Sequence, residues 1–218
     1  MRSAYANCRN LTGSPVCGEK IRTTGFEHAY AFCHNLTGSP ICGENVTSMR
    51  STYCYCRNLT GSPVCGKNVV IMSDTYMGCI NLTGSPICGE NVTDMSRAYQ
   101  SCDNLTGSPV CGENVVDMWS TYEGCKNLSS NGYFYSNKIT NIELCFGNRN
   151  IAKPLNLYLP ANSTSLTTAL SNTAATSMVG ADITWTNDTA NNRYYNTQYN
   201  IYIYPVANVA AARAANGD

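Results

Sequence analysis

The feature that most constrains the fold of this chain is a repeated segment. The hexapeptide NLTGSP occurs five times, and a degraded copy, NLSSNG, follows; the six copies begin at Asn10, Asn35, Asn58, Asn81, Asn104 and Asn127. The copies are therefore 25, 23, 23, 23 and 23 residues apart. A fixed period of this length is typical of a solenoid, in which each repeat forms one coil that stacks on the next. We predict about six such coils over residues 1–150.

One coil runs from Asn104 to Cys125 and reads NLTGSPVCGENVVDMWSTYEGC. Its LTGSPV part predicts a short extended stretch, and the following CGEN predicts a turn. The spacing i, i+3, i+7 of three apolar residues in VVDMWSTY predicts one stripe of a short helix or 3₁₀ turn. The positions expected to face inward are apolar in nearly every copy, and here they are Leu105, Val110, Val115, Met118, Tyr122 and Cys125.

This pattern resembles the leucine-rich repeats of the BspA type. A Cys is followed by NL, a short strand, a V-T-x-M segment and an aromatic residue three positions before the next Cys, as in Val92, Thr93, Met95, Tyr99 and Cys102. The resemblance covers roughly residues 1–150, although these coils are shorter than usual and have Gly-Ser-Pro where Leu often stands. It implies an α/β repeat fold, a leucine-rich-repeat solenoid. Proteins with such repeats are surface adhesins of bacteria and parasites, or virion and tail proteins of phages.

Beyond residue 150 the composition changes to Asn, Thr, Ser, Ala and Tyr, without cysteine. We expect residues 151–218 to form a small α+β C-terminal cap or attachment module. Alternating patterns predict strands over Leu155–Leu159, Ala181–Trp185 and Tyr199–Tyr204, the last ended by Pro205. Helices are predicted over Ser163–Ser171, capped by Asn162 or Ser163, and over Val206–Ala215. Lys138–Ile142 resembles the V-T-x-M segment, with Phe146 in the place of the tyrosine.

Eleven of the thirteen cysteines form two series with the period of the repeat. Side chains stacked in a ladder point the same way, whereas a disulfide requires a specific facing geometry. We therefore predict small, reduced thiols that pack as apolar residues, which is compatible with assembly in a cytosol. Cys54 and Cys56 form a lone C-x-C motif without a paired partner motif, so no metal site is predicted.

The asparagine that begins each NLTGSP copy stands in an N-x-S/T triplet, as do Asn45, Asn91, Asn162 and Asn187. In a secreted eukaryotic protein these would be glycosylation acceptors. We predict instead that the repeated asparagines bond the backbone of the neighbouring coil in a buried ladder. The glutamates Glu19, Glu44, Glu90 and Glu113, a row interrupted by Lys67, are expected to form a solvated edge.

Several function classes are disfavoured by composition. Charged residues make up 13% of the chain, with 14 basic and 14 acidic side chains, so no field would attract nucleic acid. No apolar run is long enough for a membrane span or an export signal. The two histidines, His28 and His34, have no paired nucleophile in a motif, and no glycine-rich phosphate loop follows a strand. We predict a protein that is not an enzyme and needs no cofactor.

If the coils serve as a scaffold, recognition should lie where the copies differ. The position before each NL changes from Arg57 to Ile80 to Asp103, and aromatic or basic residues appear near the Met and Cys positions. The residues expected to bind a partner are Arg57, Ile80, Asp103, Arg97, Trp119 and Tyr55. The alternative is that these solvent-facing positions vary by drift alone.

The resemblance and the repeats together favour a non-enzymatic virion protein, such as a phage tail fibre or surface decoration, at the virion surface. A bacterial or parasite cell-surface adhesin is the alternative, and a purely architectural role is a third. Expected partners are other virion or surface subunits, a host-surface protein or glycan, or a second copy of the chain. Because Met1 occupies the Met position of a repeat, we expect a longer polypeptide or another subunit to cover this end.

Overall fold

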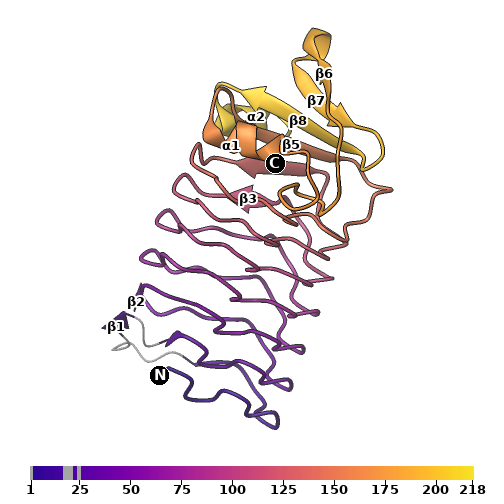
Figure 1. Cartoon of the computed structure of the whole chain (residues 1–218). Coiled ribbons are helices and arrows are strands. Elements are labelled where there is room, and N and C mark those ends of the chain that lie inside the picture. Colours follow the sequence, from indigo (N-terminus) through magenta and orange to yellow (C-terminus); the bar gives the residue numbers. More distant parts are fainter. Residues whose placement is uncertain (1, 17–21, 24–25) are drawn as a thin grey trace.

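The computed structural model describes residues 2–16, 22–23 and 26–218. The chain winds back and forth in layers that stack into an elongated body, and the C-terminal segments cover one end of the stack (Figure 1). Backbone hydrogen bonds join the layers: the N–H groups of Tyr53, Tyr76 and Tyr99 donate to the carbonyl oxygens of Thr75, Ala98 and Thr121 at 2.8–3.0 Å. We call one passage between successive tyrosines of this set a layer. The assignment of these layers to the leucine-rich-repeat class stays a prediction.

Regular strands within the layers are very short. Strands β1 (Arg22–Thr23) and β2 (Asn45–Val46) pair in parallel, and β3 (Val110–Cys111) pairs in parallel with β4 (Asn131–Phe134). Between these pairs, single parallel bridges connect successive layers through Ser48, Ile71, Asp94, Asp117 and Asn141. Adjacent layers are therefore paired in parallel, and most layers contribute only one or two residues to this pairing.

Of the two alternatives predicted for this part of each repeat, a short helix or a 3₁₀ turn, the short helix is wrong. The segment around Met95–Cys102 forms consecutive turns, with left-handed backbone at Arg97 (φ 53°) and Ser101 (φ 58°). The N–H groups of Met95, Arg97, Tyr99 and Ser101 donate to the next layer. Those of Ala98 and Gln100 close turns on the carbonyl three positions back, and that of Ser96 donates to the Asp94 side chain at 2.9 Å. A helix would need all of these N–H groups for its own carbonyls, so stacking and helix formation exclude each other here.

The predicted inward-facing set is confirmed at five of its six positions. Leu105, Val115, Met118 and Tyr122 have no exposed surface, and Cys125 is buried. Val110 was expected inside as well, but it is only half-buried. Its neighbours Pro109 and Cys111 face the core instead, because successive residues of an extended segment point to opposite sides.

Stacked aromatic rings run along the core. Tyr30, Tyr53, Tyr76, Tyr99 and Tyr122 lie with adjacent ring centroids 5.6–5.7 Å apart and nearly parallel. Phe146 continues the stack at 5.7 Å, which confirms its predicted place in the tyrosine position. Each hydroxyl both accepts from the backbone N–H and donates to the carbonyl oxygen of one residue across the layer, for example Ile87 for Tyr99. The tyrosines thus fix the width of every layer.

The cysteine series that precedes each NL pairs with this stack. The thiols of Cys33, Cys56, Cys79, Cys102 and Cys125 donate to the carbonyl oxygen of a tyrosine in the preceding layer, at 2.9–3.1 Å. All twelve cysteines that the structure describes are free, and most are buried; Cys17 lies outside the described residues. The prediction that thiols pack as small core residues is confirmed for the buried members.

A six-stranded sheet, in the order β3-β4-β5-β8-β7-β6, joins the last layers to the C-terminal module. Strand β5 (Leu155–Pro160) confirms the strand predicted there and alternates buried and half-buried residues. It pairs in parallel with β4 on one side and with β8 (Ile201–Val206) on the other. The expected boundary near residue 150 therefore lies within one continuous sheet.

Helix α1 (Thr164–Ala169) is capped by Ser163, and α2 (Val209–Ala215) is capped by Asn208, so both predicted C-terminal helices are present. The strand predicted at Ala181–Trp185 is wrong. The antiparallel hairpin lies further along, in β6 (Thr186–Asp188) and β7 (Arg193–Asn196), joined by the 3₁₀ helix η2 (Thr189–Asn191). Asp188 caps η2 and bonds Arg193 at 2.9 Å, which sets the turn inside the predicted loop.

Strand β8 continues through Pro205 to Val206, so the predicted end at Pro205 is wrong. Pro205 lies opposite Leu159 in the parallel register, and its carbonyl oxygen accepts a hydrogen bond from the Asn192 side chain at 3.2 Å. Proline lacks only the N–H donor, so a strand can pass through it where that donor is not needed. Within the described residues, no helix is long and apolar enough to cross a membrane.

Candidate functional site

Each layer has a segment of consecutive turns between its Met and Cys positions, such as Met95–Cys102. Three side chains on the outer surface of these turns form one cluster across three layers. The guanidinium of Arg97 pairs with the carboxylate of Asp74, with 2.8 Å between Nε and Oδ1. The same guanidinium lies over the ring of Trp119, 4.8 Å from its centroid. We call Asp74, Arg97 and Trp119 the outer cluster. It contains two of the six residues predicted to bind a partner.

The electrostatics of the outer cluster are set by partial burial. The side chain of Asp74 is 12% exposed and that of Arg97 is 36% exposed. Burial raises the pKa of the Asp74 carboxyl, and the nearby Arg97 opposes this rise. The ion pair and the indole together hold the guanidinium in one orientation at the surface. A partner would therefore meet a pre-ordered cation beside an aromatic ring.

The remaining predicted residues do not join this cluster. Tyr55 stacks on Phe32 with centroids 5.3 Å apart, and Arg57 lies 5.9 Å from the Tyr55 centroid. Ile80 is 40% exposed. Asp103 forms its own ion pair with Lys126 at 2.8 Å. Four of the six predicted residues thus fall in two separate groups, and Ile80 and Asp103 belong to neither. The prediction missed Asp74 and Phe32, which stand one repeat before Arg97 and Tyr55 in the same rows.

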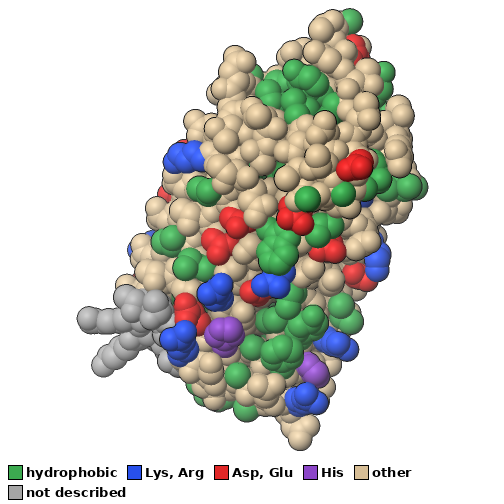
Figure 2. Space-filling model, in the orientation of Figure 1, with side chains coloured by type: hydrophobic (Ala, Val, Ile, Leu, Met, Phe, Trp, Pro, Cys, Tyr) green, Lys and Arg blue, Asp and Glu red, His purple; other side chains and the backbone are tan. Residues whose placement is uncertain are grey.

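One long face of the molecule carries charges of both signs between hydrophobic side chains (Figure 2). No large area of a single sign dominates this face. Such a mixed surface gives no long-range attraction for a polyanion. Recognition at this surface would depend on short-range contacts.

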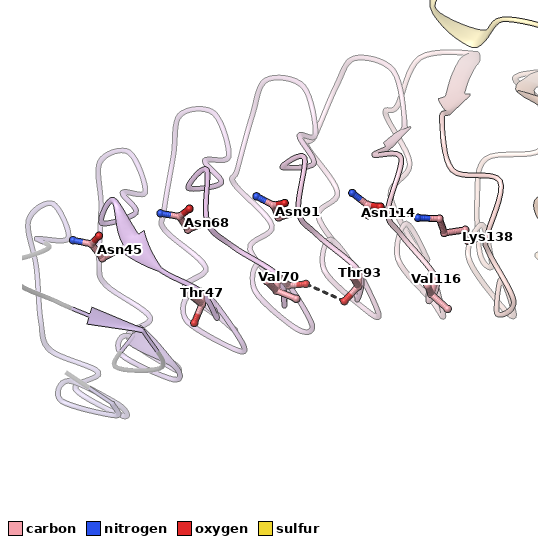
Figure 3. A pocket seen from close by; sticks show the side chains of 9 residues that line it. All are labelled: Asn45, Thr47, Asn68, Val70, Asn91, Thr93, Asn114, Val116 and Lys138. Carbon is pink, nitrogen blue, oxygen red and sulfur yellow. Dashed lines mark hydrogen bonds between the residues drawn. The ribbon is translucent and has the colours of Figure 1, made fainter.

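A groove that the sequence prediction missed runs along the stack. Its cavity volume is about 860 Å³, and it is lined by two rows of side chains, Asn45, Asn68, Asn91 and Asn114 in one and Thr47, Val70, Thr93 and Val116 in the other, with Lys138 at one end (Figure 3). The residue between the two rows in each layer is a fully buried valine, such as Val92. Alternation along each extended segment therefore places one asparagine and one Thr or Val side by side on the outer surface.

The backbone beneath the groove is a continuous ladder. The N–H groups of Val70, Thr93 and Val116 donate to the carbonyl oxygens of Thr47, Val70 and Thr93 at 2.8–2.9 Å. Equivalent side chains in neighbouring layers are thus held at the spacing of parallel strands, about 4.8 Å. The groove presents the same pair of positions once in every layer.

Three asparagines of the groove form hydrogen bonds between layers. Asn68, Asn91 and Asn114 donate through Nδ2 to the carbonyl oxygens of Glu44, Lys67 and Glu90, each at 2.9 Å. Figure 3 shows these nitrogen atoms directed toward the preceding layer. The burial predicted for the NLTGSP asparagines is wrong, since nearly all of them are exposed. The predicted bond to the neighbouring backbone is confirmed for Asn127, whose Nδ2 donates to the Asp103 carbonyl oxygen at 2.8 Å. The signal for the groove was the recurring N-V-T or N-V-V triplet, which repeats with the same period.

Anchoring of Nδ2 leaves the asparagine oxygen atoms facing the groove. Lys138 Nζ donates to the Oδ1 atom of Asn114 at 2.8 Å and closes one end. Within the part of the chain that the structure describes, the Oδ1 atoms of Asn68 and Asn91 accept no hydrogen bond from protein groups. The groove therefore offers a row of oriented acceptors above aliphatic and hydroxyl side chains.

The described residues contain no group of three or more His, Cys, Asp or Glu side chains placed to hold a metal ion. Burial raises the pKa of the Cys65 thiol to about 12 and that of Cys88 to about 11, so both are protonated at neutral pH. A protonated thiol is a poor nucleophile. The raised pKa values thus disfavour Cys65 and Cys88 as nucleophiles.

Comparison with protein-family models, with curated proteins and with solved structures found no match. The likeness to BspA-type repeats therefore depends on the residues quoted above. Functional conclusions depend on the outer cluster and the groove.

Proposed function

We propose that the protein is a non-enzymatic binding scaffold displayed on a virion surface, where the outer cluster contacts a host receptor or another virion protein. The observation that carries this proposal is the arrangement of Asp74, Arg97 and Trp119. Three layers with the same backbone supply three different side chains, and these make direct contacts with one another. A repeated scaffold that varies only at its surface suits recognition better than catalysis.

The residue types support a binding role. Trp and Arg are enriched among the residues that contribute most to protein interfaces. Asp74 and Trp119 restrict the Arg97 side chain before any partner arrives, and this lowers the entropy lost on binding. The backbone beneath is held by hydrogen bonds to the next layer from the N–H groups of Asp74 and Arg97. The outer cluster is thus pre-organised on a rigid support.

The proposed location follows from the resemblance to phage virion proteins and from the thiols. A secreted protein of this cysteine content would be expected to carry disulfides. The described cysteines are free and several are bonded to tyrosine carbonyl oxygens in the core. This chemistry suits a protein that assembles in a reducing cytosol before release in a particle.

The proposal is tested by binding of fluorescently labelled protein to a panel of intact bacterial cells and to purified phage particles lacking it. We expect wild-type protein to bind at least one of these targets. Trp119→Ala and Arg97→Ala should each weaken this binding at least tenfold, since central Trp and Arg contacts commonly contribute about 2 kcal/mol or more. Lys126→Ala is the matched control, because Lys126 forms an exposed ion pair outside the cluster.

Thermal unfolding of each variant would verify that the fold is retained. Equal binding by wild type and by both cluster variants would contradict the role of the outer cluster. Absence of binding to every cell type and to every particle would contradict the proposed function as a whole.

A further inference from the structure

We propose that the groove binds an extended, uncharged β-1,4-linked glycan that lies along the stack, with one sugar unit over each layer. The groove lies on a different surface row from the outer cluster and shares none of its residues. The inference therefore goes beyond the proposed function and does not depend on it.

Hydrogen-bonding groups in the groove match the hydroxyls of a sugar chain. Each sugar offers several O–H donors, and the oxygen atoms of Asn68 and Asn91 are oriented acceptors with no protein donor in the described structure. The Thr93 hydroxyl donates weakly, at 3.4 Å, to the carbonyl oxygen of Val70. Its oxygen can accept a hydrogen bond from a ligand. Polar contacts are thus available in successive layers.

The second row of the groove suits the aliphatic surface of a sugar ring. Val70 and Val116 are each 37% exposed and alternate with Thr47 and Thr93. The C–H faces of a sugar can pack on such methyl groups while the hydroxyls reach the asparagines. Small ligand sites commonly combine an apolar surface with a few placed polar groups.

The period of the groove selects the kind of polymer. Its layers repeat at about 4.8 Å, whereas side chains on one side of an extended peptide repeat at about 6.6 Å. A peptide along the groove would lose register after two or three layers. An extended β-1,4-linked hexose chain advances by nearly one layer spacing for each sugar. Every sugar of such a chain would meet the same pair of protein positions. Because successive sugars are turned by about half a revolution, the same sugar face would recur at every second layer.

Charge disfavours anionic polymers in the groove, since three glutamates outnumber two lysines, Lys67 and Lys138, beside the asparagine row. Of its lining residues only Lys138 carries a charge, and that ammonium group donates to Asn114 at the end of the row. Exposed glutamates immediately precede three of the asparagines, at Glu44, Glu90 and Glu113. These carboxylates would repel nucleic acids and sulfated glycans and leave neutral ligands unaffected.

The test uses the full chain and defined oligosaccharides in isothermal titration calorimetry. The probes are cellohexaose and fully N-acetylated chitohexaose, their disaccharides, and laminarihexaose as a β-1,3-linked control. We expect the β-1,4-linked hexasaccharides to bind at least tenfold more tightly than the disaccharides, because the groove spans the layers from Asn45 to Lys138. Laminarihexaose should bind at least tenfold more weakly, since its curved chain leaves the row.

Val70→Arg and Val116→Arg place a long side chain in the groove at positions that are already exposed, and each should reduce hexasaccharide affinity at least tenfold. Thr83→Arg, an exposed substitution on the NLTGSP segment, should leave it unchanged. The proposal is overturned if neither hexasaccharide binds at millimolar concentration, if both groove variants bind like wild type, or if the β-1,3-linked chain binds equally well. Trp119→Ala should bind the hexasaccharides like wild type. Loss of glycan binding would therefore contradict the role of the groove without contradicting the role of the outer cluster.

Discussion

The hydroxyl of Tyr99 accepts a hydrogen bond from the backbone N–H of Ile87 at 3.1 Å and donates one to the carbonyl oxygen of the same residue at 2.7 Å. Both backbone groups of one residue are therefore satisfied by one side chain from the opposite side of the layer. The same relationship joins Tyr53 to Ile41 and Tyr122 to Val110. These two hydrogen bonds of the tyrosine hydroxyl, which we call the tyrosine strut, replace the regular strand hydrogen bonds that the short extended segments lack.

Removal of one such hydroxyl should destabilise the protein although the ring stays in the stack. Tyr99→Phe leaves the N–H and carbonyl groups of Ile87 without their side-chain partner, and an unsatisfied buried polar group costs about 1–3 kcal/mol. We expect the free energy of unfolding to fall by about 2 kcal/mol in urea titrations. Tyr195→Phe is the control and should change it by less than about 0.5 kcal/mol. A Tyr99→Phe protein as stable as wild type would show that the strut is dispensable.

The glycine of the TGSP segment should be restricted by stacking as well as by backbone conformation. Gly107 has a φ of +81°, and a Cβ atom there would lie 2.2 Å from the Ser85 hydroxyl and 3.0 Å from the Ser85 Cα. Gly13 has a φ of +86°, but within the described part of the chain no atom lies within 4 Å of its Cβ position. The two glycines therefore share the same backbone strain and differ in the neighbouring layer.

We expect Gly13→Ala to cost about 1–2 kcal/mol, the penalty for a left-handed alanine. Gly107→Ala should cost at least about 1 kcal/mol more, because Ser85 must shift within a tightly packed ladder. Thermal and urea unfolding of both variants would measure the difference. Equal losses would mean that the layers adjust freely around the TGSP segment.

Sequence patterns located the core well because burial follows the repeat period. Tyr122, Met118 and Leu105 recur in every copy as bulky apolar residues, and their positions need no knowledge of the backbone path. The spacing of Val115, Met118 and Tyr122 also fits one stripe of a helix, so the sequence pattern predicts a helix where the structure has consecutive turns. The segment forms turns and not a helix because alternate backbone N–H groups donate to carbonyl oxygens of the next layer. The side-chain types do not show where these N–H groups donate.

The candidate sites were harder to predict for a related reason. Trp119 and Arg97 stood out as unusual residues in their rows, whereas the groove consists of residues that recur in every layer. The sequence predicts interlayer bonds from the NLTGSP asparagines, whereas the structure, within its described residues, places them mainly at Asn68, Asn91 and Asn114, with Asn127 alone from the predicted set. The exposure of Asn104 and the interlayer bond of Asn114 both depend on which side of an extended segment faces outward. A shift of one residue in register exchanges the two sides.

Buried thiols and phenols should make the fold sensitive to alkali. Burial raises the pKa of Cys65 to about 12 and of Cys88 to about 11, and it raises those of Tyr99 and Cys102 as well, above the ordinary values of 10.0 and 9.0. The folded state therefore holds these protons more tightly than the unfolded chain. This contribution to stability is complete below pH 9 and is lost as the pH rises through the folded-state values.

We expect the free energy of unfolding, measured in urea with a reductant, to decline from pH 9 upward. Each buried thiol should contribute a slope of about 1.4 kcal/mol per pH unit once the unfolded thiol ionises. Cys102→Ala should reduce the slope by one such group, because Cys102 has no exposed surface. Stability that stays constant between pH 8 and pH 10.5 would contradict the burial of these groups.

Two of the interlayer ion pairs, Arg97–Asp74 and Lys126–Asp103, should differ in strength because their burial differs. Arg97 and Asp74 have side-chain exposures of 36% and 12%, whereas Lys126 and Asp103 have exposures of 59% and 40%. Double-mutant cycles with alanine should give a coupling free energy of about 1 kcal/mol for the first pair and less than about 0.3 kcal/mol for the second. In 1 M NaCl the second coupling should vanish and the first should persist, since salt screens exposed charges most. Equal couplings would mean that Asp74 is solvated like a surface carboxylate, and the outer cluster would then not be pre-organised for a partner.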